Sequence, residues 1–443
     1  MTAFETSRAD WLSVEEALHR VLAAAEPLPR EDVPLLEALG RALAEPVVAG
    51  ATLPPWDNSA MDGYAVRADD IAGASEPAPV RLRDIGSARA GSSFPGTVEA
   101  GEAIRIMTGG PIPPGADSVV RVEDTDGGTT SDGWVLVRSD RDGGRHVRPG
   151  GQDMSAGEVL LDVGDSIGPG QIALAAAAGL ARLAVRRRPT VAVLSSGNEL
   201  RGPVDFQDVV AGRGVPETNG STLAAAVAAC GAVPLPLGIA LDEPEHIRAM
   251  VRRSLEADVL VTTGGASMGE ADLFKRVLEE DGLDVDFWRV RIRPGSPFSL
   301  ARLPREAGTR SLPVLGLPGN PASAFVTFQL FVRPFVLRLA GHARVHRRWL
   351  DMVAGERLSS TPDLCHFLRV VVDTDAGAPR ACLTGHQGSG LVGSLGRAHG
   401  LAVLPEGTET VEAGDPVRVV LLDDIPGPSA TPGWAPSASF PKA

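Results

Sequence analysis

A stretch near the middle of the chain, residues 257–279 (ADVLVTTGGASMGEADLFKRVLE), constrains the fold more than any other. Its first part, 258–263, is an apolar, β-branched run long enough for one buried strand. Gly264 and Gly265 follow, and there the backbone can turn sharply or approach a ligand closely. After a polar segment, apolar residues recur at helical spacing: Leu273, Phe274, Val277 and Leu278. The stretch therefore predicts a strand, a glycine-rich loop and a helix.

The loop of this unit carries groups suited to binding an anion together with a cation. Backbone amides in such a loop and the start of the helix favour an anion such as phosphate. Ser267, Glu270 and Asp272 add hydroxyl and carboxylate oxygens, which can hold a hard cation beside it. A structural alternative is that Asp272 only caps the helix and the glycines only turn the chain.

Two further stretches repeat the pattern. Residues 190–194 (TVAVL) run into SSGNEL, which contains Glu199, and residues 312–317 (LPVLGL) run into the PGNP turn at 318–321 and an apolar helix at 322–332. Strands that each end in a polar loop before a helix predict an open parallel sheet. Ligands of such sheets bind outside the carboxyl ends of the strands, so the three loops are expected to line one crevice.

The length, net charge and cysteine count of the chain argue against some classes of protein. At 443 residues the chain is long for one core and is expected to form two to four domains. A net charge of −14 argues against broad nucleic-acid or anionic-membrane binding. The sequence shows no signal peptide and no apolar run of about 18 residues. Three widely spaced cysteines fit a reducing compartment. We therefore expect a cytoplasmic protein that binds neither nucleic acid nor membrane.

Two amphipathic helices are predicted near the N-terminus. Residues 13–25 have one apolar face and begin with Ser13 and Glu16 at capping-box spacing. A second helix is predicted near 35–44. Helices placed this early can pack on each other or on a second subunit.

The loop at residues 52–68 (TLPPWDNSAMDGYAVRA) is a candidate functional segment. It holds Trp56, Met61 and Tyr64 together with Asp57 and Asp62, whereas a solvated linker seldom carries so many large apolar residues. The alternative is an ordinary turn capped by Asp57. Short strand-like runs follow between residues 80 and 165 and predict a small β domain.

Positive charge is concentrated at residues 287–300 (FWRVRIRPGSPFSL). The pattern predicts a strand that carries Arg289, Arg291 and Arg293 on one face, followed by a turn at PGSP. This strand is the best local source of positive charge for an anionic substrate.

With these stretches in place, the chain resembles the molybdopterin molybdenumtransferase family, which includes MoeA and the gephyrin E domain. The resemblance covers about residues 10–425 and rests on several long motifs that occur in order: DNSAMDGYA, RIMTGGPIPPGAD, GGQD, SSGNEL, TTGGASMGEAD, RPGSPF, LPGNPASAFVTF and HQGS. A chance match to one such motif is plausible, but a match to all of them in sequence is not.

The resemblance implies a multidomain α/β plus β fold. We expect a helical and extended dimerisation region at 1–50 and 155–188, interrupted by an inserted small β domain at 51–154. An open-sheet α/β domain that binds molybdopterin follows at 189–342, then a second small β domain at 343–425. The last segment, 426–443, is rich in Pro, Ser, Ala and Gly and is expected to be disordered.

The resemblance also implies an activity. Members of the family insert molybdate into the dithiolene of adenylated molybdopterin with Mg²⁺, and release AMP and the molybdenum cofactor. They are homodimers in which the sheet domain of one subunit faces the small β domain of the other across the cleft. A molybdopterin adenylyltransferase and molybdoenzymes are the further partners to be expected.

Site residues follow from the motifs, position by position. The carboxylates expected to be catalytic are Glu199, Asp242 and Asp272, which we expect to hold Mg²⁺, with Asp57 and Asp62 from the facing domain. Residues expected to bind the substrates are Thr108, Asp153, Gly264, Gly265, Ser267, Gly269, Arg293, Ser296, Pro318, Gly319, Asn320, Pro321 and Ser389. Of these, Arg293 and Ser296 are expected to face molybdate or phosphate.

The chain departs from the family pattern at several positions. Ser296 and Arg293 stand where the family commonly has lysines, Asn198 where it has the aspartate of GDEL, and Glu217 where it has an aspartate. A catalytically lapsed paralogue that carries molybdopterin is therefore an alternative to the active enzyme. A third hypothesis is the related adenylyltransferase, which needs only a stand-alone sheet domain. The extra domains argue against it.

Overall fold

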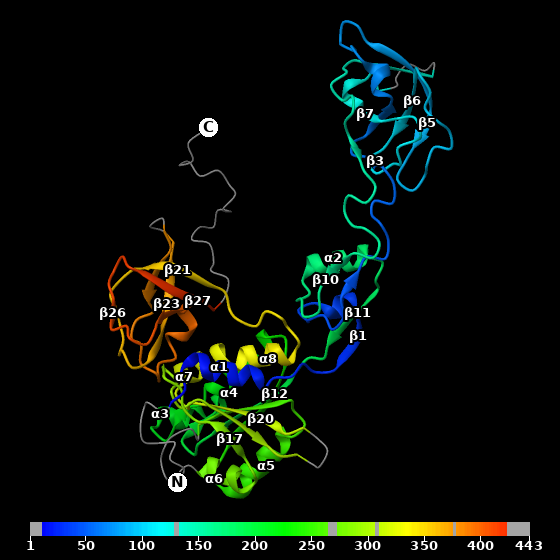
Figure 1. The fold of residues 1–443 in the computed structure, drawn as a ribbon. Coiled ribbons are helices and arrows are strands. Elements are labelled where there is room, and N and C mark those ends of the chain that lie inside the picture. The colour runs from blue at the N-terminus through cyan, green and yellow to red at the C-terminus, as the bar shows by residue number, and fades with distance from the viewer. Residues whose placement is uncertain (1–10, 128–132, 265–272, 306–309, 375–377, 423–443) are drawn as a thin grey trace.

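The computed structural model describes residues 11–127, 133–264, 273–305, 310–374 and 378–422. The chain is elongated (Figure 1). A central α/β region carries a β barrel on one side, and long extended segments lead from it to a small β domain at the far end of the molecule.

The central sheet has six strands in the order β15-β12-β16-β20-β19-β17. β15 (Val233–Ala240), β12 (Thr190–Ser196), β16 (Val259–Thr263) and β20 (Leu312–Leu317) run parallel, whereas β19 (Ser299–Leu303) and β17 (Asp284–Phe287) are antiparallel additions at one edge. The predicted open parallel sheet is confirmed. The loops after β12, β16 and β20 meet at one edge, because these three strands are neighbours with the same direction.

Helices cover both faces of this sheet (Figure 1). One apolar core packs α4 (Asn219–Ala229), α1 (Val14–Ala23) and a long helix against it, and a second core packs α5 (Pro244–Ser254) and α6 (Leu273–Glu280) on the other face. The long helix runs through α7 (Pro321–Thr327), η6 (Phe328–Val332) and α8 (Arg333–Leu339). Residues 321–339 are long and apolar enough to cross a membrane, but 78% of the apolar window is buried inside the protein, as in a core helix.

The N-terminal helix begins as predicted. Ser13 accepts a hydrogen bond from the Glu16 amide (3.1 Å), and Glu16 accepts one from the Ser13 amide (2.8 Å), so the capping box is formed. The predicted helix at 35–44 is wrong, since only a 3₁₀ turn, η2 (Leu35–Ala38), is present. The chain instead pairs with distant residues, because the amides of Gly40 and Leu43 donate to the carbonyls of Ile167 and Asp165.

Segments near residues 30–48 and 159–186 are joined by hydrogen bonds. β1 (Arg30–Pro34) pairs with β11 (Arg182–Arg186), and β2 (Val47–Val48) pairs with β10 (Val159–Leu161). α2 (Pro169–Ala177) packs against η2 over a small core that includes Val33, Leu43, Ala175 and Val185.

The small β domain lies between these two segments in the sequence. Its five-stranded sheet has the order β7-β4-β6-β5-β8, built from β7 (Ser118–Arg121), β4 (Gly63–Val66), β6 (Glu102–Ile106), β5 (Val80–Ala88) and β8 (Trp134–Val137). Two short turns, η3 (Ala68–Ile71) and η4 (Val122–Asp124), connect its strands. β3 (Asn58–Ser59) pairs with β9 (Val147–Arg148) at the side where the extended segments enter.

The C-terminal β region is a closed barrel. Its strands are β21 (Trp349–Ala354), β23 (Cys365–Asp373), β24 (Arg380–Leu383), β25 (Gly400–Leu404) and β27 (Pro416–Leu421), and β23 also pairs with β25 to close it. A smaller pair, β22 (Leu358–Ser359) and β26 (Thr410–Val411), and the turn η7 (Leu395–Arg397) complete it. β18 (Ile292–Arg293), which comes from the α/β region, pairs with the start of β23.

The predicted strand at 287–300 is wrong. β17 ends at Phe287, and the next residues pair with the N-terminus instead, because Leu12 exchanges hydrogen bonds with Arg289 and Arg291. The three arginines consequently diverge. Arg289 lies over the ring of Trp11, Arg291 forms an ion pair with Glu406 (3.0 Å), and Arg293 lines a cavity.

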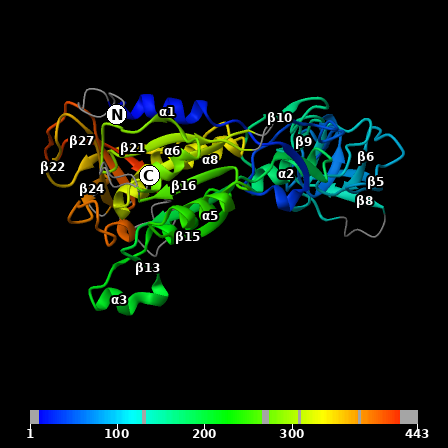
Figure 2. The same cartoon turned by 90° about the horizontal axis from the view of Figure 1, so that it is seen from below.

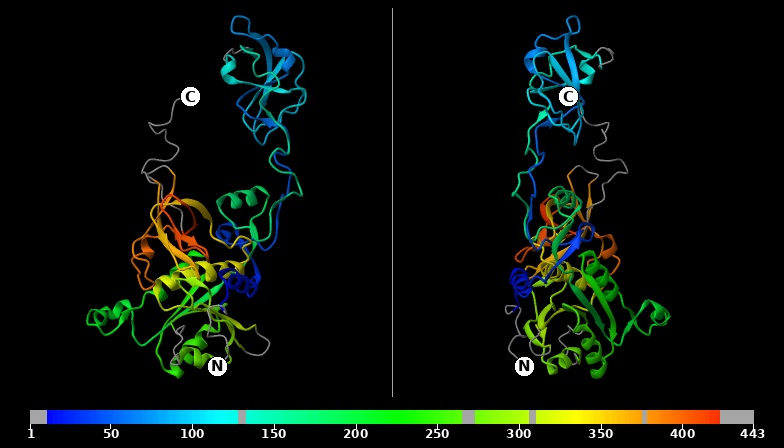
Figure 3. Two further views of the ribbon diagram at one scale, coloured as in Figure 1. Left: turned by 60° about the vertical axis from the view of Figure 1, so that its left-hand side comes forward. Right: turned by 90° about the vertical axis from the view of Figure 1, so that its right-hand side faces the viewer.

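One segment projects from the body of the protein (Figures 2 and 3). It comprises β13 (Leu200–Arg201), η5 (Pro203–Asp205), α3 (Phe206–Val210) and β14 (Val215–Pro216). β13 and β14 pair at its base. We refer to residues 200–216 as the arm.

Candidate active site at the carboxyl edge of the sheet

A cavity of about 690 Å³ lies at the carboxyl ends of β12, β16 and β20. It is the crevice that the parallel sheet predicts. Its lining includes, among the expected site residues, Glu199, Gly264 and the PGNP turn: Pro318, Gly319, Asn320 and Pro321.

The two backbone turns of the cavity lie close together. Gly264 has φ +83°, and a Cβ there would lie 2.4 Å from the carbonyl oxygen of Ser196 on the neighbouring strand. A side chain at Gly319 would contact the Cα of Gly264 at 3.6 Å. Only glycine fits at position 264, and the two turns leave backbone rather than side chains facing the cavity.

The PGNP turn is held from two directions. Asn219, at the start of α4, donates to the carbonyl of Gly319 (2.7 Å). Asn320 donates its side-chain amide to the hydroxyl of Ser389 (3.1 Å), and Ser389 accepts the amide of Ala322 on its carbonyl (2.9 Å). The structure thus brings the expected site residue Ser389, which belongs to the C-terminal barrel, to the turn at the edge of the sheet.

A chain of polar side chains links the strand ends to α4. Thr263 donates to Ser195 (3.2 Å), Ser195 donates to Glu217 (2.9 Å), and the same Glu217 oxygen accepts the amide of Gly220 (2.7 Å). Glu217 also lines the cavity. Sequence reasoning noted Glu217 only as a departure from the family pattern. Its position seven residues beyond the end of the arm helix, α3, gave no local signal of this role.

The acidic residues at the cavity have different surroundings. The carboxylate of Glu199 makes no hydrogen bond or ion pair among the described residues, and it folds over Gly197, where a Cβ would lie 2.5 Å from it. The backbone amide of Asp242 donates to the side-chain oxygen of Asn198 (3.1 Å), and the amide of Asn198 donates to the carboxylate of Asp242 (3.4 Å). Carboxylate oxygens left without protein donors suit a hard divalent cation, so Glu199 fits that role, whereas Asp242 contacts Asn198, the chain neighbour of Glu199.

Part of the predicted site lies outside the described residues. Asp272, Gly265, Ser267 and Gly269 all belong to that part. Across the described portion of the chain, no group of three or more His, Cys, Asp or Glu side chains comes together in a way that could hold a metal ion.

A second cavity, of about 420 Å³, lies where the barrel meets β18. Arg293, His366 and Arg369 line it, together with Gln387 and Gly388, the residues directly before Ser389. Ser296 lines neither cavity, because its hydroxyl donates to the carbonyl of Ile292 (2.6 Å).

Arg369 is the residue of this cavity that sequence reasoning missed. It is fully buried, and its guanidinium donates to Ser394 (2.8 Å) and to the carbonyl of Gly388 (3.1 Å). Its Nη1 has no partner among the described residues. Burial lowers the pKa of Arg369 from its usual value. A buried guanidinium with an unused donor beside a cavity is suited to an oxyanion.

The remaining expected residues belong to the segment 51–154, which forms the small β domain and its connections. This domain lies at the opposite end of the molecule from the central sheet and the barrel (Figure 1). Asp62 accepts hydrogen bonds from the amide and hydroxyl of Thr108 (2.7 and 2.9 Å), and these bonds lower the pKa of Asp62. Asp57 accepts the amide of Gly150 (2.8 Å), and Asp153 is exposed. The structure therefore brings Asp62 to Thr108, but it does not bring these aspartates to the cavities of their own chain.

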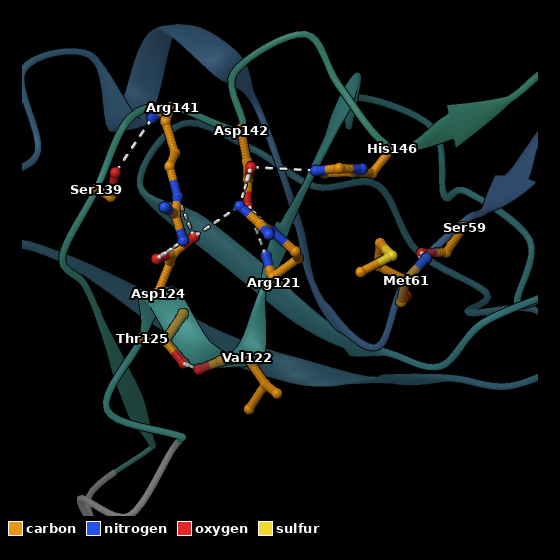
Figure 4. A network of polar contacts seen from close by, with 10 residues as sticks. All are labelled: Ser59, Met61, Arg121, Val122, Asp124, Thr125, Ser139, Arg141, Asp142 and His146. Atoms are coloured by element: carbon orange, nitrogen blue, oxygen red, sulfur yellow. Dashed lines mark hydrogen bonds and ion pairs between the residues drawn. The ribbon is translucent and has the colours of Figure 1, made fainter. Parts of the chain in front are cut away.

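A buried ionic network supports this acidic loop (Figure 4). Asp142, which is 1% exposed, accepts three hydrogen bonds of 3.1 Å from Arg121 and one of 3.1 Å from His146. Burial alone would raise the pKa of Asp142, but the bonds from Arg121 and His146 lower it to about 2. The network fixes the chain that continues into β9, which pairs with β3 directly after Asp57.

Comparison with known proteins agrees with this architecture. Three family models match successive parts of the chain: the MoeA N-terminal region (domain I and II) at residues 12–179, a probable molybdopterin binding domain at 192–338, and the MoeA C-terminal region (domain IV) at 351–422. The chain belongs to the MoeA family.

Relatives and solved structures support the assignment over nearly the whole length. Molybdopterin molybdenumtransferase 2 of Mycobacterium tuberculosis is 36% identical over 91% of this chain and 97% of its own. The Bacillus subtilis molybdopterin molybdenumtransferase is 33% identical over 94% of this chain and 95% of its own. A crystal structure of the molybdopterin biosynthesis MoeA protein from Pyrococcus horikoshii covers 93% of this chain and 99% of its own, with 33% identity and a TM-score of 0.74.

Proposed function

We propose that this protein is a molybdenum insertase, which transfers molybdate into the dithiolene of adenylated molybdopterin and releases AMP and molybdenum cofactor. The relatives named above carry the corresponding name. The observation that carries the proposal is the cavity at the carboxyl edge of the sheet, where backbone turns, a free carboxylate and the C-terminal barrel meet.

The phosphate of the pterin is bound at the two backbone turns. Gly264 and the residues of the PGNP turn leave backbone facing the cavity, and α4 begins beside them. Backbone donors and a helix N-terminus stabilise a phosphate. Ser389 positions Asn320 across this turn. Gly265, Ser267 and Gly269 continue the loop after Gly264 and are assigned the same role from the sequence.

Mg²⁺ would be held by Glu199 and Asp242, with Asp272, assigned from the sequence, as the third carboxylate. The cation, when bound, neutralises charge on the phosphoanhydride and its leaving group. Glu199 supports this assignment because its carboxylate has no protein donor among the described residues. Asp242 is held next to Asn198, the residue before Glu199, by two hydrogen bonds from backbone amides to side-chain oxygens.

Molybdate is bound in the second cavity by Arg293 and Arg369. Two guanidinium groups, one of them with an unused donor, provide the positive charge that lysines commonly supply in other members of the family. Arg291 does not take part, because it is paired with Glu406. Gly388 and Ser389 connect this cavity to the first one.

The active unit is a homodimer. Asp57, Asp62, Asp153 and Thr108 lie at the far end of their own chain, so they reach a cavity only if that cavity belongs to a second copy. The three cysteines of the chain are free thiols, which fits a cytoplasmic enzyme. It receives substrate from a molybdopterin adenylyltransferase and supplies molybdoenzymes.

The test is AMP release. Purified protein is mixed with adenylated molybdopterin, Mg²⁺ and molybdate, and AMP is measured against a control without molybdate. We expect molybdate-dependent release. Tight pterin binding with no release would instead favour the carrier hypothesis, and adenylation of molybdopterin by ATP would favour the adenylyltransferase.

A further inference from the structure

The arm exposes apolar side chains that no described residue of its own chain covers. Val204 is 93% exposed, Val210 69% and Phe206 51%, and no residue of η5 or α3 is buried. A five-residue helix is not stable in water by itself. Exposed apolar clusters of this kind mark sites of interaction.

The arm is nevertheless held in a defined shape. Asp208 in α3 forms ion pairs with Arg201 in β13 (3.6 Å) and with Arg213 on the returning segment. The amide of Val215 donates to the carbonyl of Glu199 (2.8 Å), so the base of the arm is fixed to a cavity residue. Leu200, Val215 and Pro216 at this base line the first cavity. The base of the arm therefore lies at the rim of the proposed active site, and the apolar tip projects outward from there.

The small β domain carries a complementary surface next to its aspartates. Trp56, directly before Asp57, is 46% exposed, and the backbone of Gly150 packs against it. Arg148 pairs with Asn58 across β3 and β9, is exposed, and forms no ion pair among the described residues. On the arm, Asp205 is exposed and likewise takes part in no ion pair with any residue that the structure describes.

We propose that the arm docks on the small β domain of a second copy, with Val204, Phe206 and Val210 against Trp56 and with Asp205 facing Arg148. This inference rests on the proposed function, which brings the second copy's Asp57 and Asp62 to the same cavity rim. The contact then positions these carboxylates across the cleft. The tip of the arm, residues 204–210, is a positioning element that touches no substrate.

Disulfide cross-linking tests the contact directly. The full-length chain is prepared with Val204→Cys together with Trp56→Cys, and with Val233→Cys together with Trp56→Cys as the matched control, since Val233 is also exposed on a different face, at the start of β15. We expect mild oxidation to give a disulfide-linked dimer with the first pair and none with the second. Absence of this dimer, or equal cross-linking of both pairs, would overturn the proposal.

Kinetics separates this proposal from the activity itself. The double variant Val204→Ser/Val210→Ser is expected to lower molybdate-dependent AMP release about tenfold, since two apolar contacts are lost, whereas Val233→Ser leaves it unchanged. Specific cross-linking in a protein that releases no AMP would reject the proposed function and keep the docking contact. A loss seen only when an adenylyltransferase delivers the substrate would show that the arm serves a different protein, and would overturn the proposal.

Discussion

The side-chain amide of Asn320 donates a hydrogen bond to the hydroxyl of Ser389, 3.1 Å away, and so joins the PGNP turn of the sheet to the C-terminal barrel. The two residues are 69 positions apart in the chain. The PGNP turn, which we propose binds phosphate, and the barrel that carries Arg369 are therefore coupled through one side-chain contact at the cavity.

Asn320→Ala and Ser389→Ala are each expected to lower kcat/KM for adenylated molybdopterin about tenfold, because each leaves the turn without its lateral support. The double variant is expected to lose little more than either single variant, because both remove the same bond. Steady-state AMP release measures kcat/KM for the two single variants and the double variant. Fully additive losses would show that the two side chains act separately.

Arg369→Met is expected to raise the KM for molybdate more than tenfold while the affinity for adenylated molybdopterin changes less than about twofold. The physical reason is that methionine keeps an apolar side chain in the barrel but removes the donors that a buried oxyanion needs. Arg418→Met, at an exposed ion pair on β27, is the control for loss of charge. An equal loss of pterin affinity would contradict the assignment of the second cavity to molybdate.

Asp142→Asn is expected to destabilise the small β domain by about 3 kcal/mol at pH 7, because Arg121 would lose its buried ionic partner. Since the folded protein lowers the pKa of Asp142 from 3.8 to about 2, the ionised form stabilises the fold above pH 3.8. That stabilisation is lost as the pH falls toward 2.

Urea unfolding of wild type and Asp142→Asn as a function of pH measures this effect. The difference between them is expected to shrink between pH 3.8 and 2. Asp351→Asn, which breaks an exposed pair with Arg418, is expected to change stability by less than about 1 kcal/mol. A comparable loss in both variants would argue against a special role for the buried network.

Because of His366, the stability of the folded barrel is expected to fall in mild acid. Burial, with the nearby charge of Arg293, lowers the pKa of His366 from 6.5 to about 4, and its Nε2 accepts the amide of Thr361 (3.1 Å). The unfolded chain therefore binds a proton between pH 6.5 and 4 that the folded chain does not. Stability falls over that window as the pH drops, by up to about 3 kcal/mol.

The measurement is the unfolding free energy of wild type and His366→Gln between pH 7.5 and 4. The variant is expected to lack this part of the pH dependence, because glutamine does not titrate. Parallel curves for the two proteins would assign the acid sensitivity to another group.

The central sheet could be predicted from the sequence because its signals are local. The runs at 190–194, 258–263 and 312–317 each show a buried strand followed by small polar residues, and all three form adjacent parallel strands. The predictions at 35–44 and 287–300 failed because distant partners decide those segments. Gly40 pairs with Ile167, and Arg291 pairs with Leu12.

The candidate site was predictable where backbone geometry determines it and less so where long side chains do. Gly264 and the PGNP turn are evident from glycine and proline in fixed positions. Arg369 lies within an apolar strand, CHFLRVVVD, and nothing local distinguishes it from an ordinary surface arginine. Its burial depends on Ser394 and Gly388, which lie 19 to 25 residues further along the chain.

β18 has a mechanical consequence. Residues 292–293 lie in sequence between the sheet strands β17 and β19 but are hydrogen-bonded to β23 of the barrel. Asn320 and Ser389 join the sheet and the barrel a second time at the cavity. A hinge between sheet and barrel would have to break both attachments at once. The cavity walls contributed by one chain are therefore expected to move as one rigid unit. In the proposed dimer, opening and closing of the cleft would then come from the small β domain of the second copy, which is attached through its two extended segments. We expect the relative motion of the two copies to control the access of substrate to the cavity.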